Sequence, residues 1–331
     1  MEFGVIPNWS WPRDGDPTEQ ARLTVEQGQT AIEAGYDTVW FSQHYVSEGF
    51  NQFQPLQMLS RLSADAGNTN LGTSVFLLPL HEPVAVAEQV ATLSHLFDGR
   101  LEFGVSLGYK DDEFTALDVD KSDRVGRLVD GVRILRRLWS EDDVTYDGKY
   151  HSIENVTVDP KPDDVRIHIG GNAPRSVERS GKLGDGWIIS GRTSPEEAAD
   201  LHEHYRRGVA ETDRPEWVSL NRETFVAETT EEAEEVARAG MRSRVEKWLE
   251  RGASDTADAV GEDGIESKVD EMLRQRFVGS PEEVIERIEA FEAAAGVDHV
   301  ICLYNWRTID HGDVCDSMRL FAEEVAPHFQ D

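Results

Sequence analysis

The feature of this sequence that most constrains its fold is a regular alternation of short apolar or β-branched runs with longer amphipathic stretches. The short runs have the length of buried strands, and they predict eight: 3–7, 38–42, 71–77, 101–106, 166–169, 186–189, 220–227 and 298–304. The amphipathic stretches predict helices at 17–34, 53–66, 83–96, 122–139, 174–182, 194–211, 230–250, 280–295 and 314–326. Eight strand-then-helix units indicate an α/β chain that folds as one (β/α)₈ TIM-barrel domain, residues 1–331.

A doubly wound open sheet is the competing arrangement. That fold places a glycine-rich turn after its first strand, whereas Pro7, Asn8 and Trp9 stand there in this chain. Two segments fall outside the bare repeat. Residues 144–151 contain Asp-Gly and predict a β-hairpin. Residues 251–279 are polar and acidic, and we interpret them as an insertion before the eighth helix, either a lid or a solvated surface excursion.

The charge of the chain restricts its partners. It carries 64 Asp and Glu residues against 33 Lys and Arg residues, a formal net charge of −31. A surface this negative repels phosphate backbones and anionic lipids, so we expect neither a nucleic-acid partner nor a membrane partner. The basic residues are 26 Arg and 7 Lys. Acid excess with few lysines is the composition expected of a protein from a salt-adapted, halophilic organism, and an ordinary acidic mesophile is the alternative.

The cysteines and the N-terminal residues indicate a cytoplasmic location. Cys302 and Cys315 are too few for a disulfide scaffold, and Cys302 lies in an apolar run typical of a buried thiol. The first residues lack a basic region followed by a hydrophobic stretch, so we expect no signal peptide. No apolar run approaches the roughly 20 residues that span a bilayer.

In a barrel of this kind the ligand site lies where the strands end, so the residues after each strand are the candidates. His44 follows the second strand and can act as a general acid or base, although a lone histidine is more often structural. Gly170, Gly171, Asn172 and Ala173 run into a helix start that also carries Arg175. Exposed amides, the helix dipole and the guanidinium together predict a phosphate cradle.

Aromatic residues gather at the predicted strand ends and can wall an apolar pocket for a ring system. The expected wall residues are Trp9, Trp11, Phe76 and Trp306. Some aromatic residues must be core, and Trp40 is the first candidate for that role. We find no His, Cys, Asp and Glu cluster with metal-ligand spacing, so we expect no metal site.

Several blocks of the chain, in order, match a known family. They include 34–45, 71–75, 91–105, Gly108-Tyr109 with Glu113-Phe114, 146–150, 169–171, 183–187 and 278–284. On these motifs the chain resembles the bacterial luciferase-like superfamily of flavin-dependent oxidoreductases. The resemblance implies a TIM barrel that binds FMN or a deazaflavin coenzyme at the carboxyl-terminal ends of its strands, usually as a homodimer.

The resemblance also assigns roles by position. His44 matches the active-site histidine of the family. Ser74 and Val75 fall where many members have a non-proline cis peptide that supports the flavin ring. The cofactor-binding residues implied by the matched motifs are Ser74, Val75, Gly108, Tyr109, Gly170, Gly171, Asn172, Ala173 and Arg175. One departure is Gln43, because many members carry Glu before the histidine.

The leading functional hypothesis is an FMN-dependent monooxygenase that acts on a small apolar substrate, with a separate flavin reductase as a possible partner. The first alternative is a deazaflavin-dependent reductase or dehydrogenase. It is favoured if Arg175, Arg179 and Lys182 form a basic row for the longer anionic tail of that coenzyme, and not merely a solvated helix face. The second alternative is a non-catalytic partner subunit. If the chain is salt-adapted, folding and flavin affinity are expected to improve as salt rises to molar levels.

Overall fold

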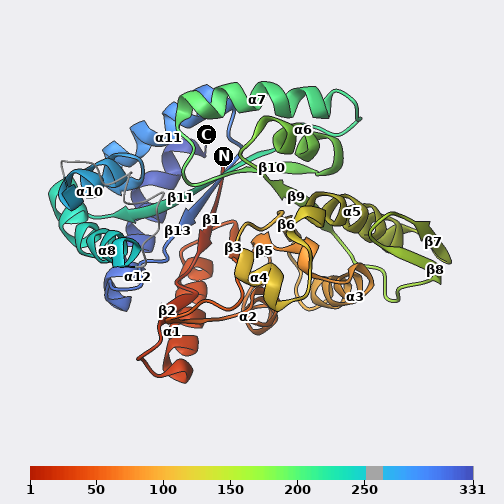
Figure 1. Ribbon diagram of the computed structural model, residues 1–331. Helices are drawn as coiled ribbons and strands as arrows, with labels where there is room; N and C mark the ends of the chain where they lie inside the picture. Colours follow the sequence, from red (N-terminus) through yellow and green to blue (C-terminus); the bar gives the residue numbers. More distant parts are fainter. Residues whose placement is uncertain (251–263, 331) are drawn as a thin grey trace.

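Eight parallel strands close into a barrel with helices around it (Figure 1). This arrangement is seen in a computed structural model that describes residues 1–250 and 264–330. The strands, in ring order, are β1 (Glu2–Ile6), β3 (Thr38–Phe41), β5 (Asn70–Phe76), β6 (Leu101–Val105), β9 (Val165–Gly170), β10 (Gly186–Ile189), β11 (Val218–Val226) and β13 (His299–Leu303). Because β13 pairs with β1, the ring has no open edge. The predicted barrel and its eight strands are confirmed, and the open sheet is excluded.

The main helices follow the predicted order. They are α1 (Pro17–Glu33), α2 (Pro55–Leu62), α3 (Pro83–Ser94), α5 (Arg124–Ser140), α6 (Pro174–Leu183), α7 (Pro195–Val209), α8 (Thr230–Glu250), α11 (Pro281–Ala295) and α12 (His311–Leu320). The local sequence explains several starts. Ser194 accepts a hydrogen bond from the Glu197 amide, and Ser280 accepts one from the Glu283 amide, each with a proline at the first helical turn.

Several short elements lie outside the eight barrel strands and the main helices. The strands β2 (Ser10–Pro12) and β4 (Phe50–Gln52) pair antiparallel, and α4 (Asp111–Ala116) follows β6. The predicted hairpin exists as β7 (Val144–Asp147) and β8 (Ser152–Val156), but its position needs correction. The hairpin was predicted within residues 144–151, with Asp147-Gly148 as its turn. In the structure β7 ends at Asp147, Gly148 begins the connection, and β8 begins after His151.

The segment between β11 and β13 is longer than in the other units. It carries α8, then α10 (Gly264–Arg274) and β12 (Phe277–Gly279), which pairs with β11, and finally α11. The interpretation of 251–279 as a lid falls partly on residues 251–263, which lie outside the described residues. In the remaining part, Val269, Met272 and Leu273 are buried, so this part packs against the protein and is not a solvated excursion.

Trp40 fills part of the barrel interior, as expected of a core residue. A Cβ on Gly4 would lie 2.4 Å from Trp40 Nε1, and a Cβ on Gly72 would lie 2.5 Å from Trp40 Cε3. The neighbouring strands β1 and β5 therefore need glycine where the indole lies. The small residue at 72 serves core packing.

A buried charged cluster lies between β6 and β9, toward the amino-terminal ends of the strands. Glu102 and His168 are both buried, and His168 Nε2 lies 2.5 Å from Glu102 Oε2. Arg100 reaches the other oxygen of Glu102 at 3.2 Å. Burial opposes ionisation of Glu102, but the hydrogen bond and charge of His168, with the charges of His299 and Arg100, lower its pKa to about 2. The cluster is a buried hydrogen-bonded network within the barrel.

Candidate active site

His44 lies just beyond the carboxyl end of β3 and is held by a buried carboxylate. Its Nδ1 lies 2.7 Å from Glu113 Oε1, and Glu113, on α4, is fully buried. The Tyr45 amide donates to the same oxygen at 2.9 Å. Burial alone would raise the pKa of Glu113, but these two hydrogen bonds and the charges of His44 and Lys110 lower it. An ionised Glu113 can accept a hydrogen bond from Nδ1–H of His44, which leaves Nε2 as the nitrogen that can exchange a proton with a substrate.

Two aromatic rings contact the His44 imidazole. Trp9, from the segment after β1, stacks on it with ring centroids 6.1 Å apart, and Tyr109 meets it edge-on at 5.7 Å. Trp9 is buried, whereas 64% of Tyr109 is exposed. A tyrosine hydroxyl keeps its proton at neutral pH, so that of Tyr109 can donate a hydrogen bond. The predicted residues Trp9 and Tyr109 are thus brought together around His44.

The Ser74–Val75 peptide is cis, which confirms that expectation. Ser42 Oγ donates to the Ser74 carbonyl at 2.5 Å, and Asn221 Nδ2 on β11 donates to Ser74 Oγ at 3.3 Å. The backbone amide of Gln43 donates to the Val75 carbonyl at 3.2 Å. Three strands thus hold this peptide at the carboxyl-terminal end of the barrel.

The side chain of Gln43, the residue before His44, bonds groups of the protein itself. Its Oε1 accepts from the Leu77 amide at 2.9 Å and lies 3.1 Å from His81 Nε2. Its Nε2 donates to Tyr45 and Gln54. Gln43 is buried, and these bonds join the segments after β3 and β5. Gln43 is therefore a buried support behind His44.

The predicted phosphate loop connects β9 to α6. Part of its donor set is already used, because the Ala173 amide donates to Ser176 Oγ at 3.1 Å. Trp187 Nε1 donates to the Gly171 carbonyl at 2.9 Å and holds the loop in place. Asn172 and Arg175 are exposed at the start of α6. The Ala173 amide is therefore not available to a ligand in this structure, whereas the side chains of Asn172 and Arg175 are exposed.

A cavity of about 450 Å³ adjoins this loop. Asn172 lines it together with Ser190, Arg192 and Thr193 from the segment after β10. The buried Arg222 holds that segment by donating to the carbonyls of Gly191 and Thr193 at 2.9 and 2.7 Å. Arg192 and Asn172 thus face one cavity from neighbouring strand ends, and the sequence did not indicate Arg192.

Three of the four predicted wall residues contact groups of the protein itself. The Trp11 indole donates to the Asn8 carbonyl and to Thr24 on α1, so it packs between the first loop and that helix. Trp306 Nε1 donates to the Thr224 carbonyl at 2.7 Å. The Phe76 ring stacks on His81 at 4.2 Å. Each of these three rings is buried. The sequence did not reveal the partner that each ring contacts.

The residues present fit a flat, polar-edged ring cofactor at this end of the barrel. A Cβ on Gly170 would lie 3.4 Å from Val75 Cγ1 and 3.5 Å from the Ser106 Cβ, so glycine keeps open the space beside the cis peptide. Asn221 Oδ1 and Trp9 Nε1 are buried and lack hydrogen-bond partners within the described chain. An unpaired buried polar atom costs roughly 1–3 kcal/mol, which a ligand or water would offset.

The sequence contained Glu113 and Asn221 but assigned them no role. Glu113 belongs to a matched motif, in which this carboxylate precedes Phe114, and that motif could have marked it. Both side chains are buried in the structure. Asn221 had no such signal, because only closure of the barrel brings β11 to β5.

We predict that Glu113→Gln lowers kcat by about 100-fold or more, by analogy with the loss of an orienting carboxylate behind a catalytic histidine. A glutamine amide can donate to Nδ1 and so favour the tautomer whose Nε2 already carries a proton. The measurement is kcat against pH for both proteins. Asp112→Asn, a change in the adjacent exposed carboxylate, is the control and should retain the wild-type rate. An unchanged rate in Glu113→Gln would remove the carboxylate from the mechanism.

Comparisons with known proteins agree with this geometry. The sequence profile of the family described as luciferase-like monooxygenase matches residues 1–299. The chain belongs to this family.

Within the described residues, no three His, Cys, Asp or Glu side chains are placed to hold a metal ion. No helix there is long and apolar enough to cross a membrane.

The luciferase-like chain is similar to enzymes of two kinds. An F420-dependent glucose-6-phosphate dehydrogenase of Microbacterium testaceum is 32% identical over 180 residues, 52% of this chain and 53% of that protein. The chain thus spans about half the length of this relative. Limonene 1,2-monooxygenase of Rhodococcus erythropolis is 23% identical over 99% of this chain and 87% of that protein. The crystal structure of monooxygenase RslO1 from Streptomyces bottropensis has a TM-score of 0.81 at 24% identity, over 99% of this chain and 100% of that one.

Proposed function

We propose that this protein is a deazaflavin-dependent oxidoreductase that transfers hydride between its coenzyme and an alcohol or carbonyl substrate. The observation that carries the proposal is the His44–Glu113 pair, with Nδ1 and Oε1 2.7 Å apart. Oxidation of an alcohol removes a proton from oxygen as hydride leaves carbon, so the site needs a base beside the substrate. The similarity to an F420-dependent dehydrogenase supports the choice of coenzyme, since F420 is a deazaflavin.

In this proposal the residues act as positioned proton carriers and walls. A bound deazaflavin supplies a ring carbon that accepts or gives hydride. His44 Nε2 takes the hydroxyl proton of the substrate, and Glu113 stabilises the resulting imidazolium through Nδ1. Trp9 holds the imidazole plane by stacking, and Tyr109 covers its edge. In the reverse direction the same imidazolium returns the proton to the carbonyl oxygen.

Ser74, Val75 and Gly170 would lie against the ring, and Asn221 Oδ1 offers a buried acceptor near it. Asn172 and Arg175 would hold the phosphate at the start of α6. Arg192, which shares a cavity with Asn172, adds a positive charge on the other side of the loop.

The second candidate is the FMN-dependent monooxygenase. It is favoured by the match to limonene 1,2-monooxygenase along nearly the whole chain. The same residues would support it, with His44 assisting proton transfer and the aromatic rings limiting water at the reacting atoms.

Titration of the purified protein with FMN and, separately, with the F420-type deazaflavin distinguishes the two candidates. We expect tighter binding of the deazaflavin, seen as a change in its absorbance, and loss of the oxidised absorbance when alcohols are added without oxygen. Oxygen consumption with reduced FMN, combined with no response of the deazaflavin, would instead establish the monooxygenase. Binding of neither cofactor would contradict both.

A further inference from the structure

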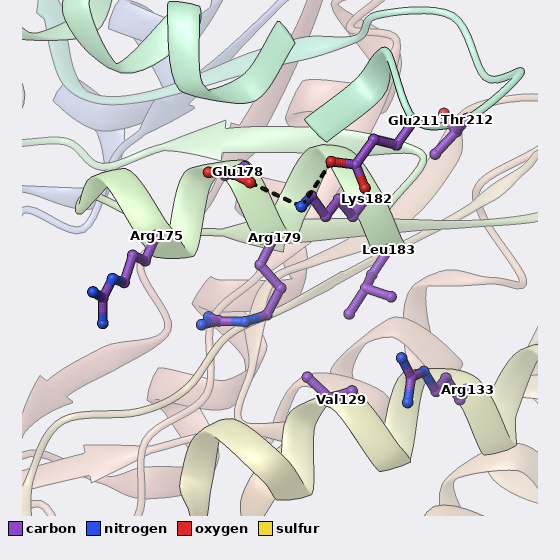
Figure 2. A pocket seen from close by; sticks show the side chains of 9 residues that line it. All are labelled: Val129, Arg133, Arg175, Glu178, Arg179, Lys182, Leu183, Glu211 and Thr212. Carbon is purple, nitrogen blue, oxygen red and sulfur yellow. Dashed lines mark ion pairs between the residues drawn. The ribbon is translucent and has the colours of Figure 1, made fainter. Parts of the chain in front are cut away.

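A groove of about 650 Å³ lies between α5 and α6, next to the phosphate loop (Figure 2). From α6, Arg175, Arg179 and Lys182 line it, and from α5, Val129 and Arg133 line it. The groove begins at Arg175, in the first turn of α6, and continues along the helix toward Leu183. It therefore leads away from the expected position of the cofactor phosphate, along the outside of the barrel.

The cations of this groove differ in what they contact. Lys182 is neutralised by Glu178 and Glu211, with Nζ–O distances of 2.8 and 2.9 Å (Figure 2). Arg133 bonds the hydroxyl of Tyr146. Across the described ranges, by contrast, neither Arg175 nor Arg179 has a hydrogen-bond or ion-pair partner, and Figure 2 shows both extending from the α5 side of α6. The basic row suggested by the sequence is thus two free arginines and one paired lysine.

Arg175 and Arg179 lack a carboxylate partner among the described residues, although the chain has 64 Asp and Glu residues against 33 Lys and Arg residues. Arg179 is half-buried, and burial lowers its pKa with no carboxylate to offset the cost. Residues four apart on a helix lie about 6 Å apart, so the two guanidiniums offer a ladder for successive anionic groups. A single phosphate at the loop would engage Arg175 but leave Arg179 unused.

We propose that the α5–α6 groove binds an acidic tail that extends from the cofactor phosphate, with Arg179 contacting a tail carboxylate and Arg175 placed between tail and phosphate. This inference rests on the proposed function, because the tail is that of a deazaflavin with several linked glutamates. The groove selects for this coenzyme over FMN, which ends at its phosphate. Lys182 takes no part, since Glu178 and Glu211 already compensate its charge.

The test measures the Kd of three probes by fluorescence or absorbance titration: FMN, a deazaflavin phosphate without glutamates, and the same deazaflavin with several glutamates. For the wild type we expect the tail to strengthen binding roughly tenfold, about 1.4 kcal/mol. Arg179→Gln should abolish this gain and leave the Kd of the two tail-free probes within about twofold. The gain should also shrink between low and molar salt, because screening weakens contacts between charges.

Lys182→Gln is the matched control, because it removes the same charge from the same helix and should preserve most of the gain. Arg179→Lys keeps the charge and should preserve part of it, which guards against misfolding of the glutamine variant. Equal affinity of the wild type for the tailed and tail-free deazaflavins, or an equal loss in Arg179→Gln and Lys182→Gln, would overturn the inference while the proposed function stood. Failure of every deazaflavin to bind would overturn the proposed function itself.

Discussion

Replacing His44 with alanine is expected to lower kcat by about 10²–10⁴-fold, the usual contribution of a positioned general acid or base. In the proposed function the substitution removes the group that exchanges a proton with the substrate and leaves Ser74, Gly170 and Asn221, the proposed cofactor contacts, in place. The Kd of the cofactor should therefore stay within about threefold, since His44 is not one of its main contacts in this proposal. Steady-state kinetics and cofactor titration on the same preparations give both quantities.

His328→Ala is a suitable control for this experiment. His328 is an exposed histidine near the amino-terminal end of the barrel, where the Met1 amine donates to the Phe329 carbonyl. Its loss should change neither kcat nor cofactor affinity. Equal kcat values for His44→Ala and the wild type would remove His44 from the chemistry. A large loss of cofactor binding in His44→Ala would instead assign it a structural role.

The second large effect is expected in stability. Glu102→Gln should lower the free energy of unfolding by about 3 kcal/mol at neutral pH, because it leaves the buried His168 without its carboxylate partner, whereas Arg100 keeps Asp164. The pKa of Glu102 is lowered to about 2 in the folded protein. Its stabilising contribution is therefore complete above the ordinary carboxyl range and is lost as pH falls toward 2.

Thermal or denaturant unfolding of both proteins across this pH range checks the expectation. The stability difference between wild type and Glu102→Gln should be constant above about pH 5 and shrink as pH falls from there toward 2. Glu141→Gln, in an exposed pair with Arg137, is the control and should leave Tm unchanged. A pH-independent difference would show that the glutamine acts through packing, and no difference at all would contradict a stabilising ion pair.

Much of the fold could be predicted from local pattern alone. Barrel strands buried on both faces appear as short apolar runs, and helix starts such as Ser194-Pro195 carry their own capping signal. The seventh unit could not be anticipated in the same way. Its polar composition suggested an insertion, whereas α10 packs through Val269, Met272 and Leu273, whose burial depends on neighbours remote in sequence.

In the candidate site, too, some residues could be predicted from motifs and others could not. His44, the Ser74–Val75 peptide and the Gly170 loop could be named from motifs, because each depends on residues adjacent in the chain. The partner of His44 could not, since Glu113 lies 69 residues away and reaches it only through the placement of α4. Trp11 and Trp306 were predicted to line the pocket. Residue type alone does not show that their indole N–H groups donate to backbone carbonyls of the protein.

The sequence by itself determined the order of strands and helices, the strongly negative surface and the family motifs, because these follow from composition, hydrophobic period and neighbouring residues. The tertiary structure alone decided which charges are paired. It neutralises Lys182 with Glu178 and Glu211 and buries Glu113 beneath His44. Among the residues that the structure describes, it leaves Arg175 and Arg179 without partners along one groove. Pairing depends on distances of a few ångströms between side chains from different elements, and only packing sets those distances.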